Sequence, residues 1–87
     1  MPELCRFRGI VFLMYADEGV HQVGHFHVRY AEYRASVAFD GSVLAGSLPA
    51  SQLKLVRQWA ARHQVELAAN WVRAREGQRL ERIDPLA

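Results

Sequence analysis

The residues most able to do chemistry lie in one stretch, HQVGHFHVRYAEYR, which spans residues 21–34. Imidazole titrates near neutral pH and can move protons or bind metal ions, whereas guanidinium matches the geometry of phosphate. The candidates are three histidines and two arginines, namely His21, His25, His27, Arg29 and Arg34. Their chemistry suggests either a metal site or a surface that binds nucleic acid.

A metal site would use His25 and His27, because alternate residues of a strand project to the same side, with His21 arriving from a loop. Gly19, His25, His27 and Glu32 also resemble the first half of the cupin motif in their spacing. The second cupin motif, which supplies another histidine, has no counterpart. The predicted hairpin also places Glu32 at a turn tip, too far from His25 to bind the same ion. We therefore expect no catalytic metal ion and no cofactor, and the pattern leaves open whether His21, His25 and His27 bind metal adventitiously.

The second hypothesis is a surface that binds or cleaves RNA without a metal ion. The polar face of the predicted strands carries His25, His27, Arg29, Arg34 and Ser36. In this hypothesis His25 and His27 are catalytic, because one imidazole takes a proton from the ribose hydroxyl and the other protonates the leaving oxygen. Arg29, Arg34 and His21 would bind the substrate phosphates. Spacing alone favours an ordinary solvated face, and it leaves open whether the protein is an enzyme.

The elements that must position these side chains are predicted from hydrophobic periodicity. We expect strands over residues 9–15, 25–30, 33–39 and 42–48, with the first as the central strand and a loop over residues 16–24. Alternation from residue 25 onward points Phe26 toward the core and His25 and His27 away from it. Asp-Gly at residues 40–41 is a strong signal for the last hairpin.

The turn between the second and third predicted strands decides which residues face each other. A two-residue turn at residues 31–32 would pair Tyr30 with Tyr33, and His27 with Ser36. Ala31 would carry a conformational cost if the turn requires a positive φ, since only glycine adopts that conformation freely.

A helical pattern follows the predicted sheet. It begins at Pro49, which suits a first helical turn, and stops at Gly77. One unbroken helix of this length would run about 40 Å, more than so small a sheet needs, so we expect a break near residues 63–65. Residues 78–83 are predicted to form a short edge strand.

Together these elements predict an α+β fold, with a small antiparallel β-meander of about four strands packed against one or two C-terminal helices. A chain of 87 residues is long enough for a single domain over residues 1–87. Trp59 and Trp71 lie at helical positions and are expected in the core rather than on a base-stacking surface.

Composition narrows the classes of function only slightly. The net charge of +2 permits a nucleic-acid partner without implying one. Cys5 is the single cysteine, so an intrachain disulfide is excluded and a reducing cytoplasm is expected. The apolar run at residues 10–15 is too short to cross a membrane, so we expect no membrane partner.

Four segments together resemble the bacterial domain-of-unknown-function family numbered four-one-six-zero: RFRGIVFLMYADE, HFHVRYAEYRA, GSLPASQLKLVRQWAARHQVELAANWVRAREG and ERIDPL. The resemblance extends over nearly the whole chain. Family members typically read His-x-Pro-Pro-His-Phe-His, so His25, Phe26 and His27 match the signature. Val23 and Gly24 replace its two prolines.

The resemblance implies a partner rather than a particular reaction. Similar proteins tend to be encoded beside another small protein, as toxin and antitoxin pairs are. This arrangement implies a partner protein, antitoxin-like, and RNA as a target. The leading hypothesis is a small cytosolic component of such a pair that binds or cleaves RNA. The alternative is a module without catalysis that docks a partner encoded nearby.

Overall fold

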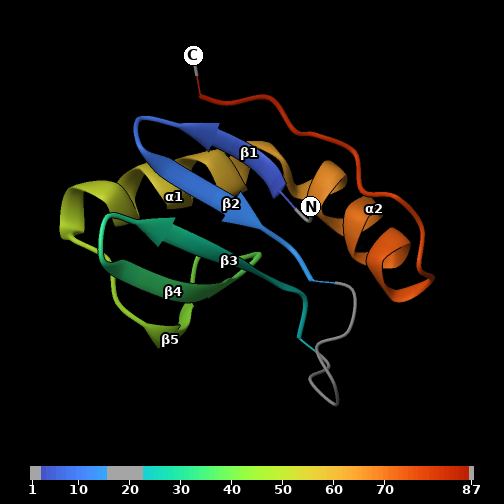
Figure 1. Ribbon diagram of the computed structural model, residues 1–87, viewed down its shortest axis with the longest axis horizontal. Coiled ribbons are helices and arrows are strands. Elements are labelled where there is room, and N and C mark those ends of the chain that lie inside the picture. The colour runs from blue at the N-terminus through green and yellow to red at the C-terminus, as the bar shows by residue number, and fades with distance from the viewer. Residues whose placement is uncertain (1–2, 16–22, 87) are drawn as a thin grey trace.

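The computed structural model describes residues 3–15 and 23–86, and in them five strands form one antiparallel meander (Figure 1). The strands are β1 (Glu3–Phe7), β2 (Ile10–Leu13), β3 (His25–Tyr30), β4 (Tyr33–Ala38) and β5 (Val43–Gly46), paired in that order. Helices follow the sheet in sequence, so the predicted α+β class is confirmed. The prediction of about four strands misses β1, and β3 rather than the strand from residue 9 is the middle one.

The β1–β2 hairpin turns at two residues with positive φ, Arg8 at 50° and Gly9 at 77°. Two successive positive φ angles match the right-handed twist of the paired strands. Glycine adopts this conformation at little cost. In Arg8 the same conformation is unfavourable, because it brings the Cβ close to the following carbonyl oxygen. A bulge between Glu3 and Cys5 also breaks the alternation of β1. These two irregularities are the reason that the sequence pattern does not reveal this strand.

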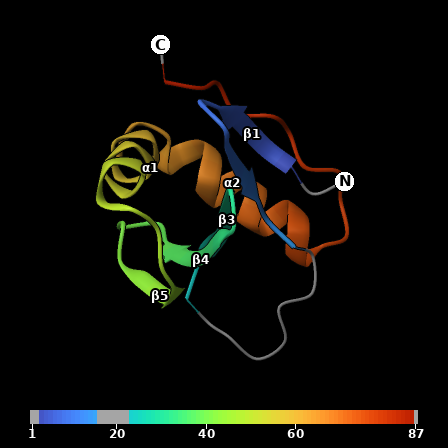
Figure 2. The ribbon, with the colours of Figure 1, turned by 60° about the vertical axis from the view of Figure 1, so that its left-hand side comes forward.

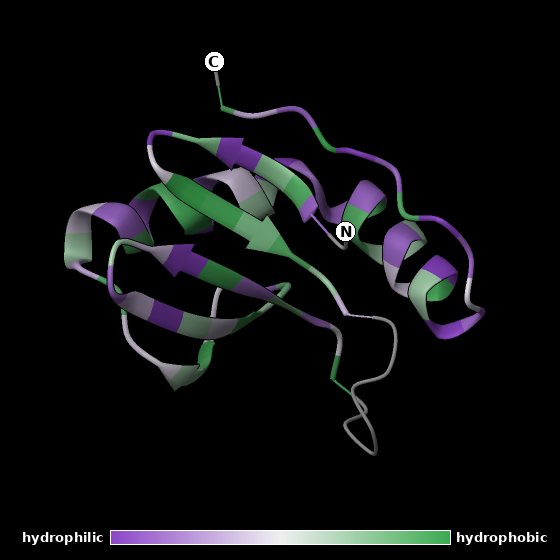
Figure 3. Cartoon of the chain, viewed as in Figure 1, coloured by the Kyte–Doolittle hydropathy of each residue, from purple (hydrophilic) through white to green (hydrophobic). Residues whose placement is uncertain are grey.

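The β3–β4 hairpin has the predicted register. Tyr30 pairs with Tyr33, and His27 pairs with Ser36. Ala31 has a φ of 52°, so the expected conformational cost at this turn is present. The alternation of hydrophilic and hydrophobic residues along β3 and β4 can be followed in Figure 3.

Two helices follow, α1 (Ala50–Arg62) and α2 (Gln64–Arg75), and the chain breaks between them at His63, as predicted. Pro49 is the residue directly before α1 and not part of its first turn. Gly77, with a φ of 72°, lies just beyond the end of α2. In the described part of the chain, neither helix is long and apolar enough to cross a membrane.

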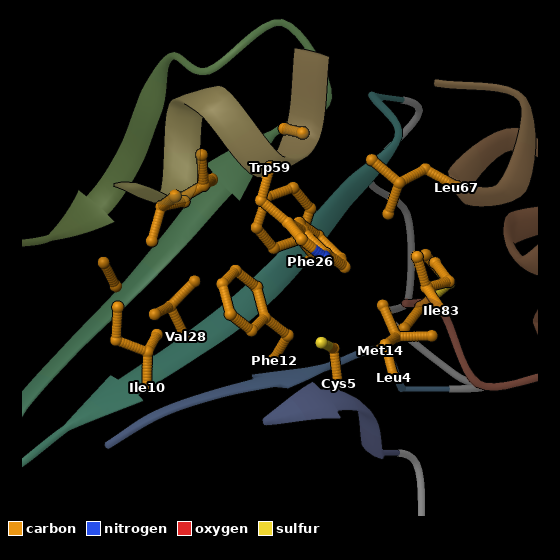
Figure 4. Close-up of a cluster of buried hydrophobic side chains, with 14 of the residues drawn as sticks. Leu4, Cys5, Ile10, Phe12, Met14, Phe26, Val28, Trp59, Leu67 and Ile83 are labelled. Carbon is orange, nitrogen blue, oxygen red and sulfur yellow. The ribbon is translucent and has the colours of Figure 1, made fainter. Parts of the chain in front are cut away.

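The core lies between one face of the sheet and the helices (Figures 2 and 4). The ring of Trp59 from α1 is fully buried and lies 4.2 Å from the ring of Phe12 and 5.5 Å from that of Phe26, measured between centroids. Its indole nitrogen donates a hydrogen bond of 2.9 Å to the carbonyl oxygen of Asp84. The prediction that Trp59 belongs to the core is therefore confirmed.

The C-terminal segment runs beside β1 without forming a strand, so the prediction of an edge strand over residues 78–83 is wrong. The amide of Ile83 donates to the carbonyl of Leu4 at 2.8 Å. Asn70 of α2 holds the same segment, because its side chain donates to the carbonyl of Glu81 at 2.8 Å and accepts from the amide of Glu81 at 2.9 Å. The hydrogen bonds of Asn70 and the burial of Ile83 thus hold the C-terminal segment in place of a regular series of strand hydrogen bonds.

Candidate functional site

The face of the sheet opposite Trp59 carries the candidate residues, and we call it the open face. Cross-strand pairing aligns Leu13, His27, Ser36 and Ala45 in one row across β2 to β5. A neighbouring row contains Val11, Arg29 and Arg34. The alternation of the strands points these side chains away from the face that Phe12, Phe26 and Val28 bury against the helices. The open face is defined by these two rows.

A hollow of about 240 Å³ lies in the open face. Its lining includes Tyr15, His27, Arg29, Arg34, Ser36 and Ala45. Ser36 and Ala45 are small, so the hollow forms where large side chains are missing from the row. Tyr15 is 40% exposed, and its ring lies edge-on to that of His27 at 4.9 Å. The hollow therefore combines an aromatic ring, an imidazole and two guanidinium groups.

Arg29 and Arg34 are opposite each other in the β3–β4 register, and both are exposed. Residues paired in this way have Cβ atoms about 5 Å apart, and like charges at such positions are destabilising. Within residues 3–15 and 23–86 neither guanidinium forms an ion pair with a carboxylate. The pair concentrates positive charge at the rim of the hollow.

His27 lies in the hollow and is half-buried. Its Nδ1 atom is 3.3 Å from the hydroxyl oxygen of Ser36, its cross-strand partner. This distance is at the long end for a hydrogen bond, so Ser36 orients the ring only weakly. The imidazole of His27 is the titratable ring that the sequence pattern and the structure both place on the open face.

His25 departs from the prediction, because only 6% of it is exposed and it does not lie on a solvated face. Its Nδ1 atom is 2.9 Å from the carbonyl oxygen of Val23. A carbonyl can only accept, so this nitrogen carries the proton. The ring lies 5.2 Å from that of Trp71 in α2 and 5.4 Å from that of His27. His25 is buried because Trp71 of α2 packs its ring against the imidazole.

Three other expectations concern metal binding and the loop. His21 lies outside the described residues, and its role in substrate binding stays a prediction. Glu32 is in the turn between β3 and β4, as expected. Among the described residues, no group of three or more His, Cys, Asp or Glu side chains is arranged to hold a metal ion.

Tyr15 and Gly46 are among the residues of the hollow that sequence reasoning missed. Gly46 has a φ of 77°, and a Cβ there would collide with the carbonyl oxygen of Arg34. The amide of Ser47 donates to that same oxygen at 3.0 Å. An isolated glycine within a strand pattern often marks such a close approach, so this signal was present. Tyr15 gave no comparable signal, because it ends an apolar run.

The fold and this face define a small α+β protein whose sheet packs helices on one side and carries paired arginines beside a histidine on the other. Residues 9–72 match the model of the family described as "Domain of unknown function (DUF4160)". The match covers more than half of the chain, so the protein belongs to this family. The matched range is shorter than the resemblance suggested, since β1 and the C-terminal segment lie outside residues 9–72. No curated protein and no solved structure matches the chain.

Proposed function

We propose that the protein binds RNA through the open face, with Arg29 and Arg34 contacting backbone phosphates. The observation that carries the proposal is their cross-strand pairing at the rim of a hollow that also holds His27. Guanidinium groups bind phosphate oxygens in a bidentate manner, and phosphate neutralisation dominates affinity for nucleic acid. A polyanion would turn the repulsion between the two arginines into a favourable interaction.

The chemistry proposed for the bound RNA is cleavage by the 2′-hydroxyl group. His27 takes the hydroxyl proton, because it is the histidine that reaches the hollow. The 2′-oxygen then bonds to phosphorus while the bond from phosphorus to the 5′-oxygen breaks, which gives a 2′,3′-cyclic phosphate. The departing 5′-oxygen takes a proton from water, and His27 returns its own proton to water. His25 was expected to act as the second catalytic imidazole. Its burial and its bond to Val23 support a different role, in which it positions the ring of His27 from 5.4 Å away. Arg29 and Arg34 hold the phosphate and stabilise the charge that develops on it.

Fluorescence anisotropy with a labelled single-stranded RNA tests binding. The double variant Arg29→Ala, Arg34→Ala should lose at least about tenfold in affinity, which is the effect expected when two charged contacts are removed. Arg75→Ala on α2 is the matched control, because Arg75 is also an exposed arginine but lies away from the open face. Equal affinity of the two variants would refute the assignment.

Incubation of the same RNA with and without a chelator tests cleavage. We expect the chelator to leave cleavage unchanged. The His27→Ala variant should not cleave the RNA but should still bind it. His25→Ala should reduce the rate and shift its pH profile without abolishing it. Binding without cleavage by the unaltered protein would restrict the function to RNA binding and remove the catalytic role of His27.

A second candidate function, docking of a partner protein, is supported by the free edge of the sheet. In the described sheet β5 pairs only with β4, whereas β1 at the other end has the C-terminal segment beside it. An exposed strand edge can accept a strand from a partner chain. We propose that the antitoxin-like partner adds a strand to the edge of β5. Expression of the protein alone separates the two functions, since a pure adaptor causes no RNA decay without its partner.

A further inference from the structure

The hollow extends beyond the phosphate contacts that the proposed function uses. Arg29 and Arg34 line one part of it, and Ser36 and Ala45, which are cross-strand neighbours on β4 and β5, line another. A phosphate backbone held by the arginines would leave this second part unfilled. That part offers a hydroxyl group and apolar surface, which suits a flat, partly polar group better than a second phosphate.

Tyr15 contributes an aromatic ring to the lining of the hollow. It is 40% exposed although it follows the buried strand β2, so its ring is available to a ligand. The imidazole of His27 packs against this ring edge-on, with 4.9 Å between the two ring centroids. Exposed aromatic rings beside a positively charged groove are the platforms on which single-stranded nucleic acids stack their bases.

The geometry points to an unpaired nucleobase as the occupant of the hollow, stacked on Tyr15, which makes the protein selective for single-stranded RNA. This inference rests on the proposed function, because the base enters only when its flanking phosphates are held by Arg29 and Arg34. In a duplex the bases are stacked on each other and paired, so a base can reach the hollow only from single-stranded RNA or after it leaves the stack. The hydroxyl of Ser36 lies where it can contact the edge of an inserted base.

Two substitutions test the inference without removing any charge. Tyr15→Leu removes the aromatic ring and keeps an apolar side chain. Ala45→Phe fills the hollow, and it is tolerated because Ala45 is exposed on a strand, where aromatic residues are favourable. The matched controls are Tyr33→Leu, since Tyr33 is 37% exposed but does not line the hollow, and Ala68→Phe on the exposed side of α2.

The probes are a labelled single-stranded octauridylate and a blunt RNA duplex of eight base pairs, each titrated into the full chain. The unaltered protein should bind the single strand more tightly than the duplex. Tyr15→Leu and Ala45→Phe should each weaken binding of the single strand by at least about fivefold, the lower end of the contribution of one stacked base. Neither variant should change binding of the duplex, and neither control should change either affinity.

The outcomes separate the two proposals. Equal binding of both probes, or unchanged affinity of Tyr15→Leu and Ala45→Phe for the single strand, would overturn the inference and leave the phosphate contacts intact. Failure of the unaltered protein to bind either probe would overturn the proposed function itself. Circular dichroism of each variant, with the spectrum of the unaltered protein as reference, identifies any loss that comes from unfolding.

Discussion

Arg29 on β3 and Arg34 on β4 are direct cross-strand neighbours, and both side chains are exposed on the open face. A pair of like charges at such positions lowers the stability of the sheet. Residues that reduce stability without a structural benefit are most readily explained by binding, because a ligand of opposite charge reverses their effect. The pair therefore links the register of the sheet to the proposed function.

Replacing one arginine of this pair should stabilise the protein. Arg34→Thr removes the repulsion and introduces a residue that favours strands, so we expect the free energy of unfolding to rise by about 0.2–1 kcal/mol. Arg34→Lys keeps the charge and serves as the control. Urea unfolding at low and high salt measures the change, which should shrink as salt screens the repulsion. Equal stability of the Thr and Lys variants would contradict the prediction.

The salt dependence of RNA binding should become weaker when Arg29 and Arg34 are replaced. Each phosphate contact on a single strand contributes a slope of about 0.7 to the fall of log affinity with log salt. The double variant Arg29→Ala, Arg34→Ala should lose about this amount for each contact removed. Anisotropy titrations over a range of salt concentrations measure the slope. A slope equal to that of the Arg75→Ala control would show that the arginines do not contact phosphate.

Gly46 should be much less tolerant of alanine than Gly77, although both have positive φ angles, of 77° and 72°. At Gly77 a Cβ would meet nothing within 4 Å, so only the backbone penalty of about 1 kcal/mol applies. At Gly46 the Cβ would also collide with the carbonyl oxygen of Arg34, and we expect a loss of about 3 kcal/mol. Thermal unfolding of both variants tests the difference, and equal losses would contradict the described packing of β5 on β4.

Acid should weaken the attachment of the C-terminal segment through Glu3. The hydrogen bond from Arg6, at 3.0 Å, and a second from Arg82, at 2.9 Å, hold the pKa of this carboxyl below its ordinary value of 4.5. A lowered pKa in the folded protein adds stability that is present above pH 4.5 and is lost as the pH falls through the lowered pKa.

The Glu3→Gln variant tests this dependence. It should be less stable than the unaltered protein at pH 7, and the two should converge in stability below the lowered pKa. Urea midpoints measured between pH 7 and pH 3 give the comparison. Glu66→Gln provides a second carboxyl control, because the hydrogen bond that lowers the pKa of Glu66 joins it to His63 rather than to the C-terminal segment. If the urea midpoints of Glu3→Gln and the unaltered protein differed by the same amount at every pH, ionisation of Glu3 would not contribute to stability.

The sequence pattern predicted the β3–β4 pairing correctly, because the turn that sets this pairing lies directly between the two strands. The two-residue turn after Tyr30 fixes the pairing of His27 with Ser36, and therefore also that of Arg29 with Arg34. The break between α1 and α2 followed from the size of the sheet. In contrast, β1 depends on a turn in which Arg8 has a positive φ, a conformation that its residue type does not indicate.

The candidate site was predicted only in part, because contacts distant in sequence decide the rest. Alternation along β3 placed both histidines on the polar side, and His27 does lie there. His25 is covered by Trp71 of α2, a contact that no pattern within β3 could indicate. The hollow arises from small residues on β4 and β5 that become adjacent only through pairing, together with Tyr15 at the end of an apolar run.

The most direct test of the account is a titration of the isotope-labelled protein with single-stranded RNA, followed by amide chemical shifts in two-dimensional NMR spectra. We expect the changes to concentrate on the open face and the rim of the hollow, at His27, Arg29, Arg34, Ser36 and Ala45. Amides on the outer side of α1 and α2 should remain unchanged. Shifts confined to the helices, or no shifts at RNA concentrations well above the Kd from the anisotropy assay, would contradict the proposal that this sheet binds RNA.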